Sequence, residues 1–222
     1  MKMFPRKANN LFLIFSLLST AVITPSISGC DACGAIEKFD VLVSKDETCQ
    51  QKWSDYESQL QRRSDMIPQL VSVVKGSAAH EQETLSAVVQ ARANATRPEI
   101  HLDPKSDDFS NPEKIKAFQQ AQAQLGTALG KLMMIQESYP DLKANQAFHD
   151  LQITIEGTEN RIGRSREEYN KSVQGYNLEL RRVGGRAINS LTGKEFKVRE
   201  YFKMDPEAGK APTIDFSKGD KK

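Results

Sequence analysis

The sequence predicts an all-α protein, an elongated antiparallel bundle of about four helices, two of them long and kinked. Two observations support this prediction. Apolar residues recur three and four positions apart over long stretches, which places them along one face of a helix. Charged residues make up 27% of the 222 residues and hydrophobic residues 38%, as expected for helices with one buried stripe and a solvated outer face. The length allows one domain or at most two small ones.

The first long helix is expected from about residue 36 to residue 75. Pro68 lies inside it, and a proline removes one backbone donor and clashes with the preceding turn. We therefore expect a kink near Arg63, or a short restart capped by Ser64 or Asp65. The apolar stripe of this helix consists of Trp53, Tyr56, Leu60, Arg63, Ile67, Leu70 and Val74.

Two shorter helices should follow. The second is expected from about 78 to 95, and the third begins near Pro112 with Asn111 as its cap. Residues 97–112 between them contain three prolines and are expected to form a mobile linker. The residues expected to face inward are Leu85, Val88, Val89 and Ala91 in the second helix, and Ile115, Phe118, Ala121 or Gln122, Leu125, Leu129, Leu132 and Ile135 or Gln136 in the third.

The last long helix has the clearest pattern. Gly184 and Gly185 should end it, and its length of about 40 residues corresponds to roughly 60 Å. Residues 184–222 are expected to be an extended tail that packs on the bundle or is disordered, with apolar clusters at 196–202 and 214–216. The stripe of the helix consists of Phe148, Leu151, Ile155, Thr158, Ile162, Ser165, Tyr169, Val173, Tyr176, Leu180 and Val183.

The N-terminal residues have the pattern of a lipoprotein signal peptide over 1–29. Lys2, Arg6 and Lys7 precede an apolar run at 11–23, which is shorter than the roughly 20 residues that cross a bilayer. Ile27-Ser28-Gly29-Cys30 looks like a bacterial lipobox, so we expect a lipid anchor on Cys30. The alternative is a short anchor that is not cleaved. The expected location is the bacterial cell membrane, with the bulk of the chain on the periplasmic or extracytoplasmic side.

Cys33 and Cys49 are not expected to pair with each other. They are 16 positions apart, and a continuous helix between them would separate them by roughly 24 Å, which is far beyond disulfide reach.

No catalytic, metal or cofactor site is predicted, and the chain is not expected to be an enzyme. His80-Glu81 would need a second histidine at 84 to form a zinc motif, and position 84 is Thr. No phosphate-binding loop or nucleophile elbow is present. Without the first 29 residues the formal charge falls from +2 to −1, and there is no basic stripe, so nucleic acid is not an expected partner.

Polar residues near the two strong stripes form the candidate site. Arg63 and Thr158 both occupy positions on the buried face, where an unpaired charge is costly. We interpret them as part of a cross-helix ion-pair network that joins Arg63 to Glu156 or Glu159. The alternative is a polar groove that receives a partner segment or a ligand. The candidate residues are Arg62, Arg63, Asp65, His80, Glu81, Glu156, Glu159, Asn160 and Arg161.

Several strings in these helices resemble the LemA family. They occur in one order along the chain, which makes the resemblance specific. The strings are LQRRSDMIPQLV at 60–71, Lys75-Gly76, Ala79-His80-Glu81, Thr84-Leu85, YPDLKAN at 139–145, EGTENRI at 156–162, Tyr169-Asn170 and Tyr176-Asn177, with Tyr201-Phe202 and Ile214-Asp215-Phe216 in the tail.

The resemblance implies a membrane-tethered helical bundle over residues 30–183 with no established reaction. It also implies protein partners in the cell envelope, among them membrane proteases. The expected function is therefore that of a membrane-anchored binding or scaffold protein. The alternative is a ligand-binding protein or enzyme with a small polar site near Arg63 and Glu159. The chain departs from the usual family pattern in its lipobox, where many members have a longer transmembrane anchor, and in the proline-rich stretch at 97–112.

Overall fold

The computed structural model describes residues 30–104, 106–182, 185, 188 and 196–203, with side chains from residue 37 onward. All regular structure in these residues is helical, which confirms the all-α prediction. The α-helices are α1 (Cys30–Ser77), α2 (Gln82–Ala95), α3 (Pro112–Met134), α4 (Pro140–Lys143) and α5 (Gln146–Arg181), and two 3-10 helices, η1 (Asp107–Ser110) and η2 (Ile135–Glu137), join them.

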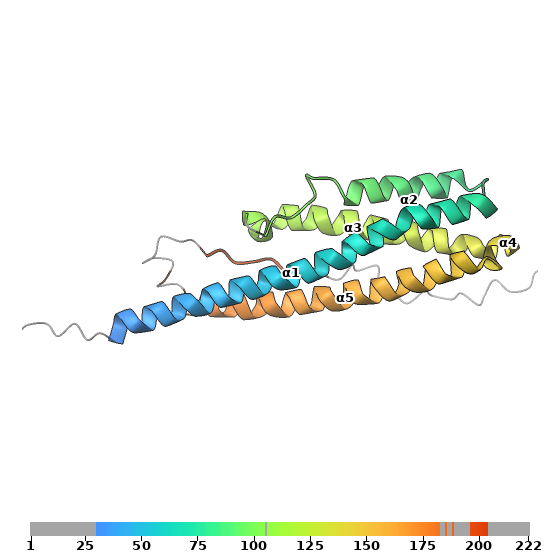
Figure 1. The fold of residues 1–222 in the computed structure, drawn as a ribbon. Coiled ribbons are helices and arrows are strands. Elements are labelled where there is room, and N and C mark those ends of the chain that lie inside the picture. Colours follow the sequence, from blue (N-terminus) through green and yellow to red (C-terminus); the bar gives the residue numbers. More distant parts are fainter. Residues whose placement is uncertain (1–29, 105, 183–184, 186–187, 189–195, 204–222) are drawn as a thin grey trace, which may run out of the picture.

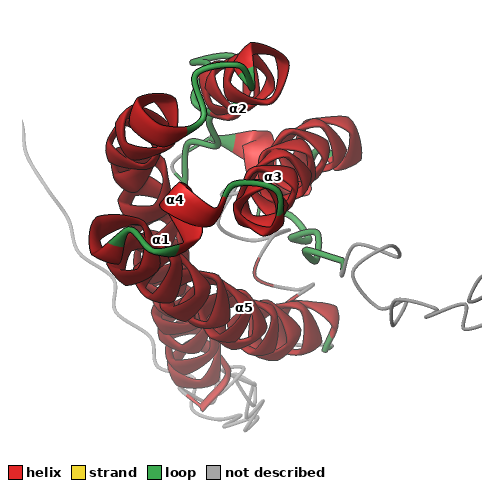
Figure 2. Cartoon of the chain, turned by 90° about the vertical axis from the view of Figure 1, so that its right-hand side faces the viewer, coloured by secondary structure: helices red, strands yellow, loops and turns green. Residues whose placement is uncertain are grey.

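The two longest helices, α1 and α5, run antiparallel and lie side by side (Figure 1). Helices α2 and α3 form a second antiparallel pair, which covers the C-terminal half of α1. Seen along the long axis, these four helices surround a common interior (Figure 2). At its other end, α1 projects beyond the last turn of α5 (Figure 1).

Helix α1 runs through Pro68 as one helix, so the predicted restart near Ser64 is wrong. Proline has no N–H to donate to the carbonyl four residues earlier, which is that of Ser64. In the structure the Arg92 Nε of α2 donates to this Ser64 carbonyl at 2.9 Å. The hydrogen bond that Pro68 cannot make is thus supplied by a neighbouring helix, which also fastens α2 to α1.

The buried side chains form two clusters along the long axis. One is rich in aromatic residues and is centred on Trp53; we call it the aromatic cluster. The other is mainly aliphatic, includes Ile67, Leu125 and Ile155, and lies nearer the C-terminal end of α1; we call it the aliphatic cluster. Arg63 and Thr158 are buried at the level where the two clusters meet, between Leu60 and Ile67 on α1 and between Ile155 and Ile162 on α5.

The stripes predicted for α3 and α5 are confirmed with few exceptions. Leu151 is only partly buried at the edge of the aliphatic cluster. On α2, Val89 is 52% exposed, so its predicted inward position is wrong. Helix α2 packs through a narrow face that includes Leu85, Val88 and Ala91, and Val89 lies about 100° around the helix from Val88. Val183 lies outside the described residues.

The stretch at 97–112, predicted to be a linker, is part of the core. It forms η1 and buries Leu102 and Phe109, each 1% exposed. Composition predicted a loop here, and a loop can still carry large apolar side chains inward. The predicted start of α3 is confirmed, since the Asn111 side chain accepts hydrogen bonds from the amides of Glu113 and Lys114.

Cys33 and Cys49 both lie on the continuous α1, so they cannot reach each other, and Cys49 is a free, buried thiol. Over the described residues, no helix is long and apolar enough to span a membrane.

Candidate functional site

A polar layer crosses the interior where the two clusters meet. From α1, Arg63 is 3% exposed, and its Nη1 donates to Glu159 of α5 at 3.0 and 3.3 Å. Its Nη2 donates to the side-chain oxygen of Gln122 on α3. Gln122 in turn donates to the Ala95 carbonyl, the last residue of α2, at 3.3 Å. One arginine and one amide therefore join all four longer helices at a single level.

Of the two carboxylates considered from the sequence, Arg63 reaches Glu159. Thr158 is buried on the inner face of α5. Glu159 lies about 100° around the helix from Thr158, whereas Glu156 lies about 160° away and is exposed. The side chain of Glu159 is 41% exposed, so the layer places a buried cation against a carboxylate that water can reach. Arg63 Nε has no hydrogen-bond partner among the described residues.

The remaining candidate residues lie in other places. Glu156 accepts a hydrogen bond from Gln152 at 3.0 Å, and Asn160 and Arg161 are exposed on α5. His80 is exposed in the turn between α1 and α2. Its neighbour Glu81 accepts a hydrogen bond from the Tyr139 hydroxyl at 2.9 Å. The structure thus brings Arg63 and Glu159 together, and it does not gather the other candidates around them.

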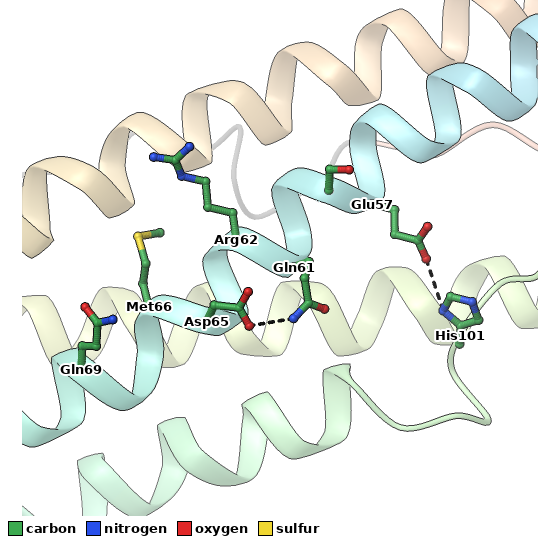
Figure 3. Close-up of a pocket in the computed structure, with 8 residues that line it drawn as sticks. Glu57, Gln61, Arg62, Asp65, Met66, Gln69 and His101 are labelled. Atoms are coloured by element: carbon green, nitrogen blue, oxygen red, sulfur yellow. Dashed lines mark hydrogen bonds and ion pairs between the residues drawn. The ribbon is translucent and has the colours of Figure 1, made fainter.

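Arg62 and Asp65 line an open groove of about 690 Å³ on the outer face of α1, which we call the α1 groove (Figure 3). At one end Glu57 faces His101 at 3.4 Å, and farther along Gln61 donates to Asp65 at 2.7 Å. The groove carries charges of both signs. Its lining residues are Glu57, Ser58, Gln61, Arg62, Asp65, Met66, Gln69 and His101.

A second polar arrangement, which the sequence analysis did not identify, holds residues 196–203; we call them the tail segment. Asn177 donates to the Arg199 carbonyl at 2.8 Å and accepts from the Arg199 amide at 3.0 Å. Asn170 makes the same pair with Phe202, at 2.8 and 3.0 Å. Three further contacts to the tail backbone are Tyr176 hydroxyl to Lys197 carbonyl at 3.0 Å, Glu200 amide to Phe109 carbonyl at 2.7 Å, and Gln119 side chain to Lys203 carbonyl at 2.8 Å.

The spacing of the two asparagines matches that of the residues they hold. Seven residues of helix rise about 10.5 Å, and three residues of extended chain cover about 9–10 Å. The sequence signal for this was the repeat of Tyr169-Asn170 as Tyr176-Asn177. Both tyrosines are buried as core residues, but the asparagines that follow them bind the backbone of the tail segment.

Arg199 is the buried charge of the tail segment. It is 6% exposed, and its Nη2 and Nε donate to one oxygen of Asp46 on α1 at 2.8 and 3.2 Å. The guanidinium also lies over the rings of Phe109 and Tyr176, at 5.3 and 5.6 Å. Burial lowers the pKa of Arg199, but the Asp46 carboxylate outweighs it and the pKa is raised. Burial also raises the pKa of the Tyr176 hydroxyl.

Phe202 occupies a cage of four rings in the aromatic cluster. It stacks on Trp53 with centroids 5.7 Å apart, and it contacts Tyr56, Phe118 and Tyr169 at 5.5, 5.6 and 5.0 Å. We call the residues that contact the tail segment the tail site: Phe39, Asp46, Asp107, Phe109, Gln119, Asn170, Tyr176 and Asn177, together with this cage.

The fold and these sites define a class of elongated helical proteins with an ion pair set across the interior. Among the described side chains, no group of three or more His, Cys, Asp or Glu residues could hold a metal ion. The chain belongs to the LemA family, whose profile matches residues 52–216, a range that includes both the polar layer and the tail segment.

The chain is similar to magnetosome proteins. The chain is 28% identical over 193 residues to magnetosome proteins MamQ 1 and MamQ 2 of Paramagnetospirillum magneticum, which covers 80% of this chain and 68% of each relative. It is 26% identical over 220 residues to magnetosome protein MamQ of Magnetospirillum gryphiswaldense, which covers 92% of this chain and 75% of the relative.

Proposed function

We propose that this protein is a membrane-tethered binding protein of the bacterial cell envelope, an antiparallel helical bundle that engages partners through the α1 groove. The observation that supports this proposal is the division of polar residues between interior and surface. Arg63 donates hydrogen bonds to Glu159 and Gln122, so its charge is paired inside the bundle. Arg62 and Asp65, its close neighbours in sequence, are exposed in the groove.

The tether in this proposal is a lipid on Cys30, the first residue of α1. The lipobox-like string ending at Cys30 supports it. A helix rises 1.5 Å per residue, so the α1 groove would begin about 40 Å from Cys30 and end about 58 Å from it. Partners on the extracytoplasmic side, including membrane proteases with large domains outside the bilayer, would contact the groove at this distance from the membrane.

The test is site-specific photo-crosslinking in cells. A photoreactive residue replaces Gln61 in the groove, and the matched control replaces Gln174, which is exposed on α5. We expect one protein to be captured at Gln61 and not at Gln174, and we expect Arg62→Glu to abolish the capture. Equal yields at both positions, or capture that Arg62→Glu leaves unchanged, would overturn the groove as the partner surface.

The lipid tether is tested separately. Mass spectrometry of the mature N-terminus should find a diacylglyceryl cysteine at position 30. An N-terminus that still begins at Met1 in the membrane fraction would overturn it.

A small cavity supports a second candidate, the binding of a small polar ligand beside the polar layer. The cavity has a volume of about 130 Å³ and is lined by Trp53, Ser64 and Gln122 among others. Trp53 Nε1 and Ser64 Oγ are buried and have no hydrogen-bond partner among the described residues. Ligand pockets for drug-sized molecules are usually about 300–1,000 Å³, so this cavity suits only a ligand of a few heavy atoms.

Thermal melts against a panel of small polar metabolites would test this candidate. A stabilising compound whose effect is lost in Ser64→Ala supports it. No shift with any compound, in a protein that melts cooperatively, counts against it.

A further inference from the structure

We propose that the tail site is a receptor for an extended chain segment, and that a second copy of this protein can supply that segment in place of the chain's own tail. The proposal concerns a different surface from the α1 groove and does not depend on the proposed function.

The first support is the way the tail backbone is held. Asn170 and Asn177 each use both ends of one side-chain amide to pair with the N–H and the C=O of one tail residue. The described tail residues belong to no helix or strand, and apart from the bond between the Glu200 amide and the Phe109 carbonyl, the contacts to their backbone described above come from side chains of the bundle. A separate peptide is bound in the same way. The contacts do not depend on whether the segment is covalently joined to the bundle that binds it.

The second support is the spacing of the buried side chains. Phe196, Arg199 and Phe202 are 7%, 6% and 2% exposed, whereas Val198 and Tyr201 are 39% and 40% exposed. One residue in three faces inward, which is the repeat of a polyproline II-like extended chain and not the repeat of two of a β-strand. Buried aromatic and arginine side chains are the usual anchors of protein interfaces. The tail site therefore selects the pattern Phe-x-x-Arg-x-x-Phe.

The third support concerns the identity of the occupant. The one segment whose fit to the site is observed is residues 196–203, and every copy of the protein carries it. Ile188 is buried in the aromatic cluster of its own chain, and eight residue steps separate it from Phe196. Eight residue steps span up to about 26–29 Å, so in an exchanged pair the site of the second copy has to lie within this distance of Ile188.

A tail that enters the site of a second copy would make the same contacts as the chain's own tail. The clamps at Arg199 and Phe202, the ion pair with Asp46 and the ring cage of Phe202 would all form again between copies. The balance between the closed and the exchanged form then depends on protein concentration and on the connecting residues, as in other swapped assemblies.

The test is complementation between two full-length variants. The first, Asn170→Ala with Asn177→Ala, has an intact tail and a damaged site. The second, Arg199→Ala with Phe202→Ala, has an intact site and a damaged tail. After the two are unfolded in urea and refolded together, native mass spectrometry should detect a one-to-one heterodimer at least tenfold more abundant than any dimer of either variant alone. As a matched control, Val198→Ala placed in the first variant should leave the heterodimer unchanged.

Helical circular dichroism of each variant must show that it folds. If both fold and the mixture remains monomeric, exchange between copies is overturned. If a variant does not fold, a labelled peptide of residues 194–205 is titrated into the full chain carrying Phe202→Ala alone. Saturable binding of this peptide, lost in its Arg199→Ala version, supports a receptor site, and absence of binding overturns it. Binding of the peptide without association of folded copies would overturn the second copy as the occupant.

Discussion

The Arg63–Glu159 pair makes a prediction about stability that separates the cost of a stranded charge from the value of the pair. Breaking a fully buried ion pair costs about 3–5 kcal/mol, whereas an exposed pair contributes about 0–1 kcal/mol. The Arg63 side chain is 4% exposed but that of Glu159 is 41% exposed. Glu159→Ala should therefore fall between these limits, at about 1.5–3 kcal/mol, since Arg63 keeps Gln122 and part of the vacated space is open to water.

The arginine variants should differ from each other. Arg63→Ala removes the buried stem and leaves Gln122 without its donor, so we expect a loss of about 3–4 kcal/mol. Arg63→Met also leaves Gln122 without its donor, but it retains the stem volume and buries no charge, and the remaining Glu159 can be hydrated. A lost hydrogen bond costs about 0.5–1.5 kcal/mol, so Arg63→Met should lie within about 1.5 kcal/mol of wild type.

Urea denaturation followed by circular dichroism provides the measurement, with comparison limited to variants whose m-values agree. The Arg63→Ala and Glu159→Ala cycle should give a coupling energy of about 1–2 kcal/mol. The reasoning is refuted if Arg63→Met is more destabilised than Glu159→Ala, because the pair would then contribute net stability. It is also refuted if the two alanine losses are additive.

Three further predictions concern other parts of the chain. Leu132→Ala, at a fully buried position, should lower the free energy of unfolding by about 2–5 kcal/mol, whereas Leu178→Ala, 56% exposed, should change it by less than about 0.5 kcal/mol; equal losses in urea melts would contradict the assigned faces. Burial raises the pKa of the Cys49 thiol, so peptide-level mass spectrometry should show slow alkylation of Cys49 in the folded protein and fast alkylation in denaturant. Burial raises the pKa of Asp108, but hydrogen bonds led by that of Lys114 outweigh it and hold this pKa below its ordinary value of 3.8. Its ionised form therefore stabilises the fold above about pH 4, and this contribution is lost as the pH falls through the lowered pKa. Asp108→Asn should accordingly lower the melting temperature at neutral pH, and the difference from wild type should disappear in strong acid; a constant difference would contradict this.

Sequence periodicity was sufficient to locate the four longer helices and most of their buried faces, but it did not predict the short α4. Ile115, Phe118 and Leu125 on α3 are buried as predicted, because a helix that buries one face repeats its apolar residues every three or four positions. Periodicity does not tell how deep each position of a stripe lies, and Leu151 is only partly buried although Phe148, one turn earlier, is 1% exposed. It also does not distinguish a narrow contact from a wide one, which is why Val89 was misplaced.

The candidate site was predictable only where a polar residue interrupted an apolar stripe. Arg63 stood out because it replaces an apolar residue between Leu60 and Ile67, and the rotation of α5 then explains the choice of Glu159. In the tail site the only signal was the repeat of Tyr169-Asn170 as Tyr176-Asn177, which does not tell what the asparagines bind. Their role depends on the backbone of residues more than 20 positions away.

The paired asparagines also restrict how the length of this protein can change. Inserting one residue between Asn170 and Asn177 would turn one of them about 100° away from the tail, and inserting one residue between Arg199 and Phe202 would move one anchor out of its pocket. Either change breaks a clamp even though no contacting side chain is replaced. Helix and tail can lengthen together only in matched steps, seven residues in one for three in the other. Insertions and deletions between these clamps are therefore excluded unless they come in such pairs, whereas the turn after α1, which faces no such repeat, is free of this restriction.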